Sequence, residues 1–213
     1  MALIPSMSAG VWSYDGVIPV IAPTAFVHPA AVLIGDVIVG EGCYVGPGAV
    51  LRGDFGRIIM KTGSNVQETC VVHSFPNLEV VIEEEGHIGH GAVLHGCRVG
   101  RNAMVGMNAV IMDEAVVGEN TIVAAMAFVK AGAVLPDNSL VVGAPAKVVR
   151  TLSAEEIEWK RKGTGVYRML AIEARDKLKP ATALSAVEPD RRRVKAPEYD
   201  PLVLEKRNFS ERP

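Results

Sequence analysis

Aliphatic residues recur at every sixth position through the second half of this chain, and a small residue precedes each of them by two positions. The aliphatic positions are Val99, Val105, Ile111, Val117, Val123, Val129, Leu135 and Val141. The small residues are Cys97, Ala103, Ala109, Ala115, Thr121, Ala127, Ala133 and Ser139. A period of six fits neither an amphipathic helix, which repeats about every 3.6 residues, nor a half-buried strand, which alternates. It fits a solenoid whose chain bends after every sixth residue, so the pattern predicts an all-β fold, a hexapeptide-repeat parallel β-helix.

The same rhythm runs less regularly through the first half of the chain. We predict interior positions at Val39, Val45, Leu51, Ile59, Asn65, Val71, Ile88 and Leu94. Successive coils would pair their backbones about 4.8 Å apart along the solenoid axis. We therefore expect the β-helix over residues 26–149, after an N-terminal extension and capping strand over residues 1–25.

The repeat stops at residues 143–147, which read Gly-Ala-Pro-Ala-Lys. Ser153, followed three residues later by Glu156, matches the capping box that opens a helix. We expect a C-terminal helix within residues 150–179. Beyond it the chain is polar and rich in proline, which predicts an extended or disordered tail over residues 180–213.

The predicted helix has a weak apolar side. Its apolar residues are Ile157, Leu170, Ile172 and Leu178. Gly163 and Gly165 lie between them, and a glycine inside a helix costs about 1 kcal/mol relative to alanine. We expect the helix to be interrupted at these two glycines.

Composition and charge narrow the function classes. A length of 213 residues with 49% hydrophobic content fits one domain with a full core and appendages. The net charge of −2 gives no electrostatic case for nucleic-acid binding, and no apolar run approaches the length of a membrane span. The first Lys or Arg is Arg52, so the start lacks the charged region of a secretory signal, and three cysteines suit a reducing compartment. We expect a cytoplasmic protein that binds neither nucleic acid nor membrane.

Four of the five histidines fall in one short window: His73, His87, His90 and His95. Two of them, His73 and His90, each stand two residues after a predicted interior position, so we expect them to project alike. His95 directly follows Leu94 and should project differently. Imidazoles diverging from one prism reach a common ion only if a second prism lies alongside, and three imidazoles with an open fourth position are typical of catalytic zinc. The spacing alone fits surface histidines in unrelated hydrogen bonds equally well.

A set of motifs within residues 15–178 resembles the γ-class carbonic anhydrases. The motifs are Leu51-Arg52-Gly53-Asp54, Asn65-Val66-Gln67-Glu68, His73, Ile88-Gly89-His90 and Leu94-His95-Gly96-Cys97. Those proteins are trimeric left-handed β-helices with metal sites between subunits, so the resemblance implies left-handed coils and a homotrimer. It implies that His73, His90 and His95 bind the metal, with His90 supplied by the neighbouring subunit. The ion would be zinc or another divalent transition metal, such as iron or cobalt.

The same resemblance implies roles for polar residues around the metal. Arg52 and Asp54 would form an ion pair that fixes the trimer interface. Gln67 would hydrogen-bond the water or hydroxide on the metal, whose pKa a divalent ion lowers to roughly 7. Because an amide does not ionise, Gln67 can orient that group without changing the charge. His87 matches no ligand of the family, and we expect it to lie behind the ligands or to be incidental.

One departure from the best-known carbonic anhydrase pattern weakens that activity. The loop Ser74-Phe75-Pro76-Asn77-Leu78 is short and lacks the glutamate that shuttles protons there, and fast hydration of carbon dioxide needs such a relay.

Other segments resemble the thioesterases of bacterial phenylacetate degradation. They are Phe26-Val27-His28-Pro29, Arg52-Gly53-Asp54-Phe55-Gly56-Arg57 and Trp159-Lys160-Arg161-Lys162-Gly163-Thr164 with Tyr167. That resemblance implies hydrolysis of an acyl-CoA by a metal-bound hydroxide, with the metal stabilising the oxyanion. Tyr167 would help to position the substrate, although packing of the helix explains this residue equally well.

Three alternatives stay open: a γ-class carbonic anhydrase, a hexapeptide acyltransferase and a non-catalytic trimeric scaffold. The segment Gly143-Ala144-Pro145-Ala146-Lys147 resembles the end of many CoA-dependent acyltransferases of this repeat type. Such enzymes usually need one catalytic histidine and no metal, so the set of three histidines counts against them. A metal analysis combined with a thioesterase assay would separate these alternatives.

Overall fold

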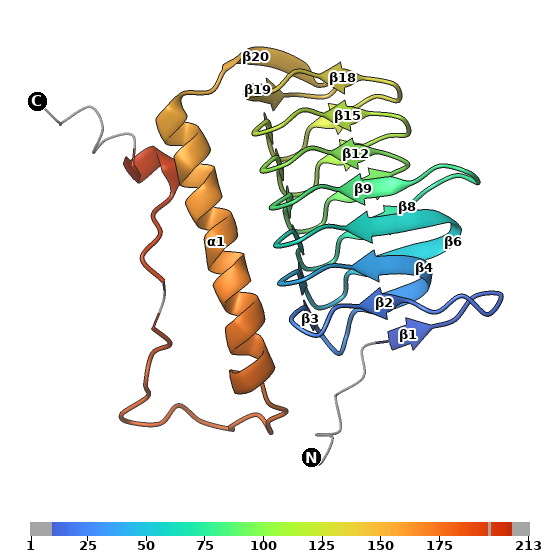
Figure 1. Ribbon diagram of the computed structural model, residues 1–213. Coiled ribbons are helices and arrows are strands. Elements are labelled where there is room, and N and C mark those ends of the chain that lie inside the picture. The colour runs from blue at the N-terminus through green and yellow to red at the C-terminus, as the bar shows by residue number, and fades with distance from the viewer. Residues whose placement is uncertain (1–9, 196, 206–213) are drawn as a thin grey trace, which may run out of the picture.

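Short parallel strands wind into a three-sided solenoid, and one long helix runs along one of its sides (Figure 1). The computed structural model describes residues 10–195 and 197–205. Each turn of the regular part contributes three strands, and each strand pairs with the strand three places further along the chain. The predicted all-β parallel solenoid with a C-terminal helix is therefore confirmed.

The three sides are named here by their strands. Side 1 contains β1 (Gly10–Trp12), β8 (Val71–His73), β11 (Val93–His95), β14 (Val110–Ile111) and β17 (Phe128–Val129). Side 2 contains β2 (Val20–Ile21), β9 (Val80–Ile82), β12 (Arg98–Val99), β15 (Val116–Val117) and β18 (Val134–Leu135). Side 3 contains β3 (Phe26–Val27), β5 (Tyr44–Val45), β7 (Asn65–Val66), β10 (His87–Ile88), β13 (Met104–Val105), β16 (Ile122–Val123) and β19 (Ser139–Val142). The long strands β4 (Val32–Val39) and β6 (Val50–Met60) pass through sides 1 and 2 without a break.

The interior matches the six-residue period in the second half of the chain. All eight predicted aliphatic positions from Val99 to Val141 are at most 7% exposed. Between β6 and β8 the predicted positions are wrong by one residue: Met60, Val66 and Val72 line the interior. Val71 instead faces outward and is 42% exposed. The cause is β6, which needs five residues from Gly53 to Ile58 where the paired strand β4 needs two from Gly35 to Val37.

The last parallel strand of the solenoid, β19, ends at Val142, and one more strand follows it. β20 (Lys147–Thr151) pairs antiparallel with β19 and closes the last coil. At the other end, β1 and β2 both pair with β4, so the sheet begins before residue 26. The part of the predicted N-terminal extension over residues 1–9 lies outside the described residues.

The helix α1 (Ala154–Lys177) begins as predicted, because Ser153 and Glu156 form both hydrogen bonds of the capping box. It continues through Gly163 and Gly165, so the expected interruption is wrong. Gly163 lies against the tail: a Cβ atom here would stand 2.5 Å from the Tyr199 hydroxyl oxygen. The close approach of the tail explains why a small residue occupies this position.

The predicted apolar side of the helix is also wrong. Leu170 and Ile172 are 38% and 61% exposed, whereas Lys160 and Thr164 are buried against the solenoid. Helix α1 packs against β3, β5 and β7 on side 3, and polar side chains of that side meet it. This part of the interface consists of hydrogen-bonding residues that a search for apolar periodicity does not find. Further along the helix, Ala171 packs with Phe26 and Tyr44 of side 3.

The tail runs back along the helix in Figure 1. The rings of Trp159 and Tyr199 stack with centroids 5.5 Å apart, and the Trp159 indole N–H donates to the Asp200 carbonyl oxygen at 2.8 Å. From residue 180 to 195 the chain forms neither helix nor strand, and residues 202–205 form one helical turn. Within the described residues, no helix combines the length and apolar character that crossing a membrane requires.

Candidate functional site

His73 and His95 lie side by side at the ends of the paired strands β8 and β11. Each directly follows an interior residue, Val72 or Leu94, so both side chains project outward at the same place. Nδ1 of His73 is 3.2 Å from Nε2 of His95. The prediction that His73 projects like His90 is wrong, because it counted from Val71 rather than from Val72.

A carboxylate contacts the other nitrogen of each ring. Oδ1 of Asp54 is 3.1 Å from Nε2 of His73, and Oδ1 of Asp113 is 2.6 Å from Nδ1 of His95. In the neutral rings these contacts place the N–H on the carboxylate side, so both facing nitrogens carry lone pairs. Tetrahedral ligand nitrogens on a zinc ion lie about 3.3 Å apart, and carboxylates commonly orient such histidines. The pair therefore fits two ligands of one divalent metal ion.

Arg52 and two aromatic rings complete this region. The Arg52 guanidinium donates to Oδ2 of Asp54 at 2.7 Å, so the expected ion pair is present within one chain. Partial burial acts to raise the pKa of Asp54, but hydrogen bonds from Arg52 and His73 outweigh it and hold the pKa below its usual range. Phe55 lies against His73 and Phe75 against His95, with ring centroids 5.4 and 5.0 Å apart. We call His73, His95, Asp54, Asp113 and Arg52 the paired half-site.

His90 lies apart from that pair, at the corner between sides 3 and 1. Its Nδ1 is 2.5 Å from Oε2 of Glu68, and the Tyr44 hydroxyl donates to Oε1 of the same carboxylate at 3.2 Å. The side chain of His90 is 47% exposed. Since Glu68 engages Nδ1, the ring presents Nε2 to the outside.

Gln67 stands beside this corner and is 2% exposed. Its Nε2 lies 3.1 Å from Oδ1 of Asn65 and 2.8 Å from Nε2 of His87. His87 lies half-buried against α1, where desolvation and then the charge of Lys160 lower its pKa to about 3. We call His90, Glu68 and Gln67 the single half-site.

The two half-sites lie at opposite edges of side 1. Glu68 and His90 precede β8 and β11, whereas His73 and His95 end those strands, and a strand of three residues spans about 10 Å. In the described part of the chain, no group of three or more His, Cys, Asp or Glu residues could hold a metal ion. A site with three histidines consequently needs two copies of the chain.

Tyr167 belongs with the single half-site. Its ring meets Tyr44 and His87 edge to face, with centroids 5.6 and 5.1 Å apart. In the same chain it does not contact His73 or His95. Its predicted role with substrate stays a prediction.

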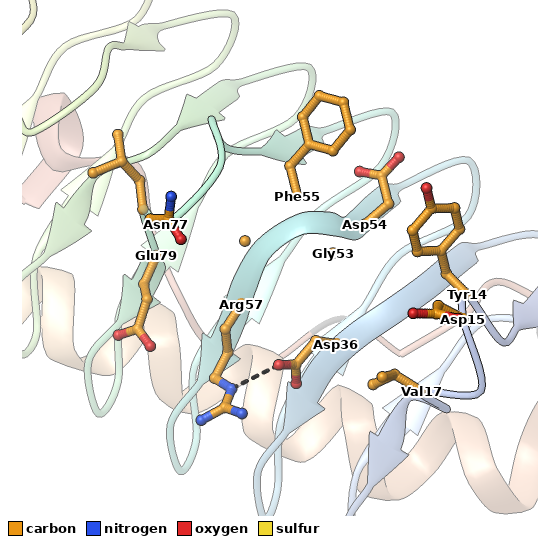
Figure 2. A pocket seen from close by; sticks show the side chains of 12 residues that line it. Tyr14, Asp15, Val17, Asp36, Gly53, Asp54, Phe55, Arg57, Asn77 and Glu79 are labelled. Atoms are coloured by element: carbon orange, nitrogen blue, oxygen red, sulfur yellow. Dashed lines mark hydrogen bonds and ion pairs between the residues drawn. The ribbon is translucent and has the colours of Figure 1, made fainter.

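A cleft of about 490 Å³ opens beside the paired half-site (Figure 2). Asp54, which contacts His73, lies beside Tyr14 on one side of the cleft, and Asn77 and Glu79 lie on the other side. The Arg57 guanidinium donates to Oδ2 of Asp36 at 2.9 Å across one end of the cleft. The cleft is therefore open space beside the candidate ligands.

Two residues of the half-sites, Asp113 and Glu68, were not predicted from the sequence. Asp113 stands 18 residues after His95, although the coil that pairs Leu94 with Ile111 takes only 17 residues. A count of coils would therefore have pointed one residue short of Asp113. Glu68 stands 22 residues before His90, because the coil between them carries the loop after His73, and that irregular spacing concealed it.

The six-residue repeat and the solenoid define a hexapeptide-repeat protein. The sequence pattern of the family described as "Bacterial transferase hexapeptide (six repeats)" matches residues 18–53 and 96–131. "Carnitine operon protein CaiE" of Salmonella agona is 54% identical over 184 residues, which are 86% of this chain and 93% of that protein. The protein of the same name from Proteus sp. is 50% identical over 185 residues, 87% of this chain and 94% of that protein. This chain belongs to the hexapeptide-repeat family that contains these CaiE proteins.

Two solved structures share the architecture. A putative acetyltransferase of Bacillus cereus superposes with a TM-score of 0.75 at 33% identity, covering 76% of this chain and 94% of that chain. A hexapeptide transferase family protein from Anaplasma phagocytophilum gives a TM-score of 0.73 at 37% identity, covering 76% and 95%. Family membership supports the predicted left-handed winding. None of these four proteins is named as a carbonic anhydrase or a thioesterase, and those activities stay predictions.

Proposed function

We propose that the chain forms a homotrimer that holds a divalent transition metal ion between neighbouring copies. His73 and His95 of one copy and His90 of the next would be the protein ligands. The observation that carries the proposal is the paired half-site, where two lone pairs 3.2 Å apart face each other while carboxylates occupy the opposite nitrogens. Each chain carries both half-sites once, so a closed ring matches every pair with one His90.

The outward surface of side 1 supports this assembly. Apolar residues stack on it from coil to coil in continuous register: Val50, Val71, Val93, Val110 and Phe128. Val71 and Phe128 are 42% and 40% exposed in the single chain. Burying an apolar stripe of this kind favours association, and the stripe lies between the two half-sites. Hexapeptide-repeat proteins are typically trimers.

We infer hydrolysis of an acyl-CoA thioester as the reaction, as in the PaaY-type thioesterases that the sequence resembles. In that reaction the oxygen of water forms a bond to the carbonyl carbon and the bond from that carbon to sulfur breaks. The leaving thiolate of CoA takes the proton that the water loses. The support for an acyl-CoA is the transferase named in the family description and the acetyltransferase named in the Bacillus cereus structure. The cleft beside Asp54 offers room for an acyl group.

Residues of both half-sites would contribute to this hydrolysis. A divalent ion on three imidazoles would activate water and polarise the carbonyl at neutral pH. Asp54 and Asp113 hold the ring N–H groups, so that His73 and His95 present unprotonated nitrogens. Phe55 and Phe75 shield both rings from bulk water. Gln67 of the neighbouring copy would orient the attacking water by a hydrogen bond.

The test combines metal analysis with an assay of thiol release. Purified protein should contain about one transition metal ion per chain and should release free CoA from acetyl-CoA or an aromatic acyl-CoA. Removal of the metal by a chelator, or His73→Ala, should abolish the release, and adding zinc or cobalt should restore it to the native protein only. Undiminished release from fully metal-free protein would refute the proposal, as would a metal-loaded trimer that releases none.

Acyl transfer is the second candidate, favoured by the names of the matching family and structures. A transferase releases CoA only when an acyl acceptor is supplied, whereas a hydrolase needs water alone. The same preparation tested with and without amine or alcohol acceptors separates these two reactions. Stopped-flow hydration of carbon dioxide, measured alongside, tests the carbonic anhydrase alternative.

A further inference from the structure

A layer of polar side chains lies between side 3 and the helix α1. Asn65, Gln67 and Thr164 are buried, and His87 lies among them. Lys160 is 2% exposed and donates to the Glu85 carbonyl oxygen at 2.8 Å and to Oδ1 of Asn102 at 2.9 Å. All buried polar side-chain atoms in the described residues have a hydrogen-bond partner.

A polar layer contributes little free energy to the packing of a helix on the solenoid. Burying polar groups stabilises little even when every hydrogen bond forms, and a missing partner costs about 1–3 kcal/mol. The second half of the helix docks through apolar groups, with Ala171, Tyr167 and Ala174 against Phe26 and Tyr44. The polar layer belongs to its first half, and it ends at Gln67, beside the corner that carries His90.

We propose that His87 is a positioning residue that fixes the orientation of the Gln67 amide through its contact with Thr164 on the helix. The inference rests on the proposed function, because it assigns Gln67 its part in that site. Nε2 of His87 lies 2.8 Å from the amide nitrogen of Gln67, and Nδ1 lies 3.4 Å from the Thr164 hydroxyl oxygen. Nδ1 also lies 3.3 Å from the amide nitrogen of Asn65, a donor that would favour an unprotonated Nδ1. The much shorter contact, with the amide nitrogen of Gln67, requires an unprotonated Nε2 instead, so the proton goes to Nδ1, which donates to Thr164 while Nε2 accepts from Gln67.

The consequence is a defined chemistry for Gln67. Its two amide hydrogens go to His87 and to Oδ1 of Asn65, so both donors point inward. Only the carbonyl oxygen of the amide is then free to meet the neighbouring copy's metal site. Gln67 therefore acts there as a hydrogen-bond acceptor and holds the attacking water by one of its O–H groups. Desolvation keeps His87 neutral, which this arrangement requires.

The ring nitrogens give a test that does not depend on activity or metal. Spectra of ¹⁵N-histidine-labelled protein distinguish a ring protonated at Nδ1 from one protonated at Nε2. The proposal expects Nδ1–H at His87, and it expects that signal to change in Thr164→Val. A ring protonated at Nε2, or at both nitrogens, at neutral pH would overturn it. This measurement uses the native trimer, so it stands even if His87 variants fail to fold or the protein shows no thioesterase activity.

Kinetics of variants test the functional half of the proposal. His87→Phe keeps a ring against Tyr167 but removes both nitrogens, and it should retain the trimer and its metal while kcat falls about tenfold or more. KM should stay within about twofold, and His87→Gln, which can accept from Gln67, should recover part of the loss. Arg168→Met is the matched control, because it breaks the helix's ion pair with Glu85 and leaves Gln67 untouched. An unchanged kcat in His87→Phe, or an equal loss in Arg168→Met, would contradict the positioning role.

Discussion

Nδ1 of His73 faces Nε2 of His95 at 3.2 Å across two paired strands. With both N–H groups held by carboxylates, the facing nitrogens carry lone pairs that repel unless a positive charge lies between them. A proton or a metal ion can supply that charge, and the third histidine on each chain favours a metal ion. Metal binding should therefore depend on the carboxylates of Asp54 and Asp113 and on the proposed trimer.

Replacing Asp113 by Asn should weaken metal binding about 10–100-fold without unfolding the protein. The amide no longer favours the ring form that leaves Nε2 of His95 unprotonated, and residues behind metal ligands typically contribute on this scale. Competition with a chromogenic chelator measures the affinity. Asp36→Asn, which changes a carboxylate paired with Arg57, serves as the control and should bind metal like the native protein. Equal affinities for all three proteins would contradict the assigned role of Asp113.

A charge placed on the apolar stripe of side 1 should break the assembly. Val71→Lys puts an ammonium group in the proposed interface, and burying it unpaired costs several kcal/mol. Light scattering should show monomers, and bound metal should be lost with the trimer. Val134→Lys is the matched control, because Val134 is 75% exposed on side 2 and should tolerate the charge. A Val71→Lys trimer with full metal content would mean that the interface lies elsewhere.

Two inactive variants should complement each other if each ion is shared between chains. His90→Ala removes the single ligand, and His73→Ala removes one ligand of the pair, so neither homotrimer should hold metal. In mixed trimers, a His73→Ala chain can supply His90 to the intact pair of a His90→Ala neighbour. Co-expression should then restore part of the metal content, whereas mixing the two purified trimers without exchange should not. Failure of the co-expressed proteins to regain metal would contradict an ion shared between neighbouring chains.

Stability should rise with pH above neutrality because of Lys160. Desolvation lowers its pKa to about 7 in the folded protein, against 10.5 for the ordinary group, so between these values the unfolded chain binds more protons. Stability then increases with pH through this window by up to about 1.4 kcal/mol per unit. Two other titratable residues face Lys160: Glu85, whose carboxylate pairs with Arg168, and His87, which stays neutral.

Comparing the native protein with Lys160→Met isolates this contribution. Urea unfolding at pH 7 and pH 9, with equal metal loading, should show a smaller increase for the variant than for the native protein. The pH dependence of metal ligation is common to both proteins and cancels in the difference. Parallel pH dependences would show that Lys160 titrates normally.

Local and periodic features were predictable from the sequence alone. The six-residue period placed the interior residues from Val99 to Val141, because each bend in the solenoid repeats the same steric demand. The capping box at Ser153 and Glu156 placed the start of α1, because both hydrogen bonds span only three residues. The resemblance to metal enzymes singled out His73, His90 and His95, whose role as ligands stays a prediction.

The tertiary structure decided which side chains meet. After β6 the interior positions lie one residue later than the sequence pattern predicts, so Val72 points inward and Val71 outward. As a result His73 lies beside His95 and not in the same orientation as His90. Likewise, Asp113 reaches His95, and Lys160 of α1 reaches Asn102, only because coils and helix stack in space. Contacts between coils depend on how many residues each turn consumes. The three additional residues that β6 carries relative to β4 change that count, and the six-residue pattern does not record them.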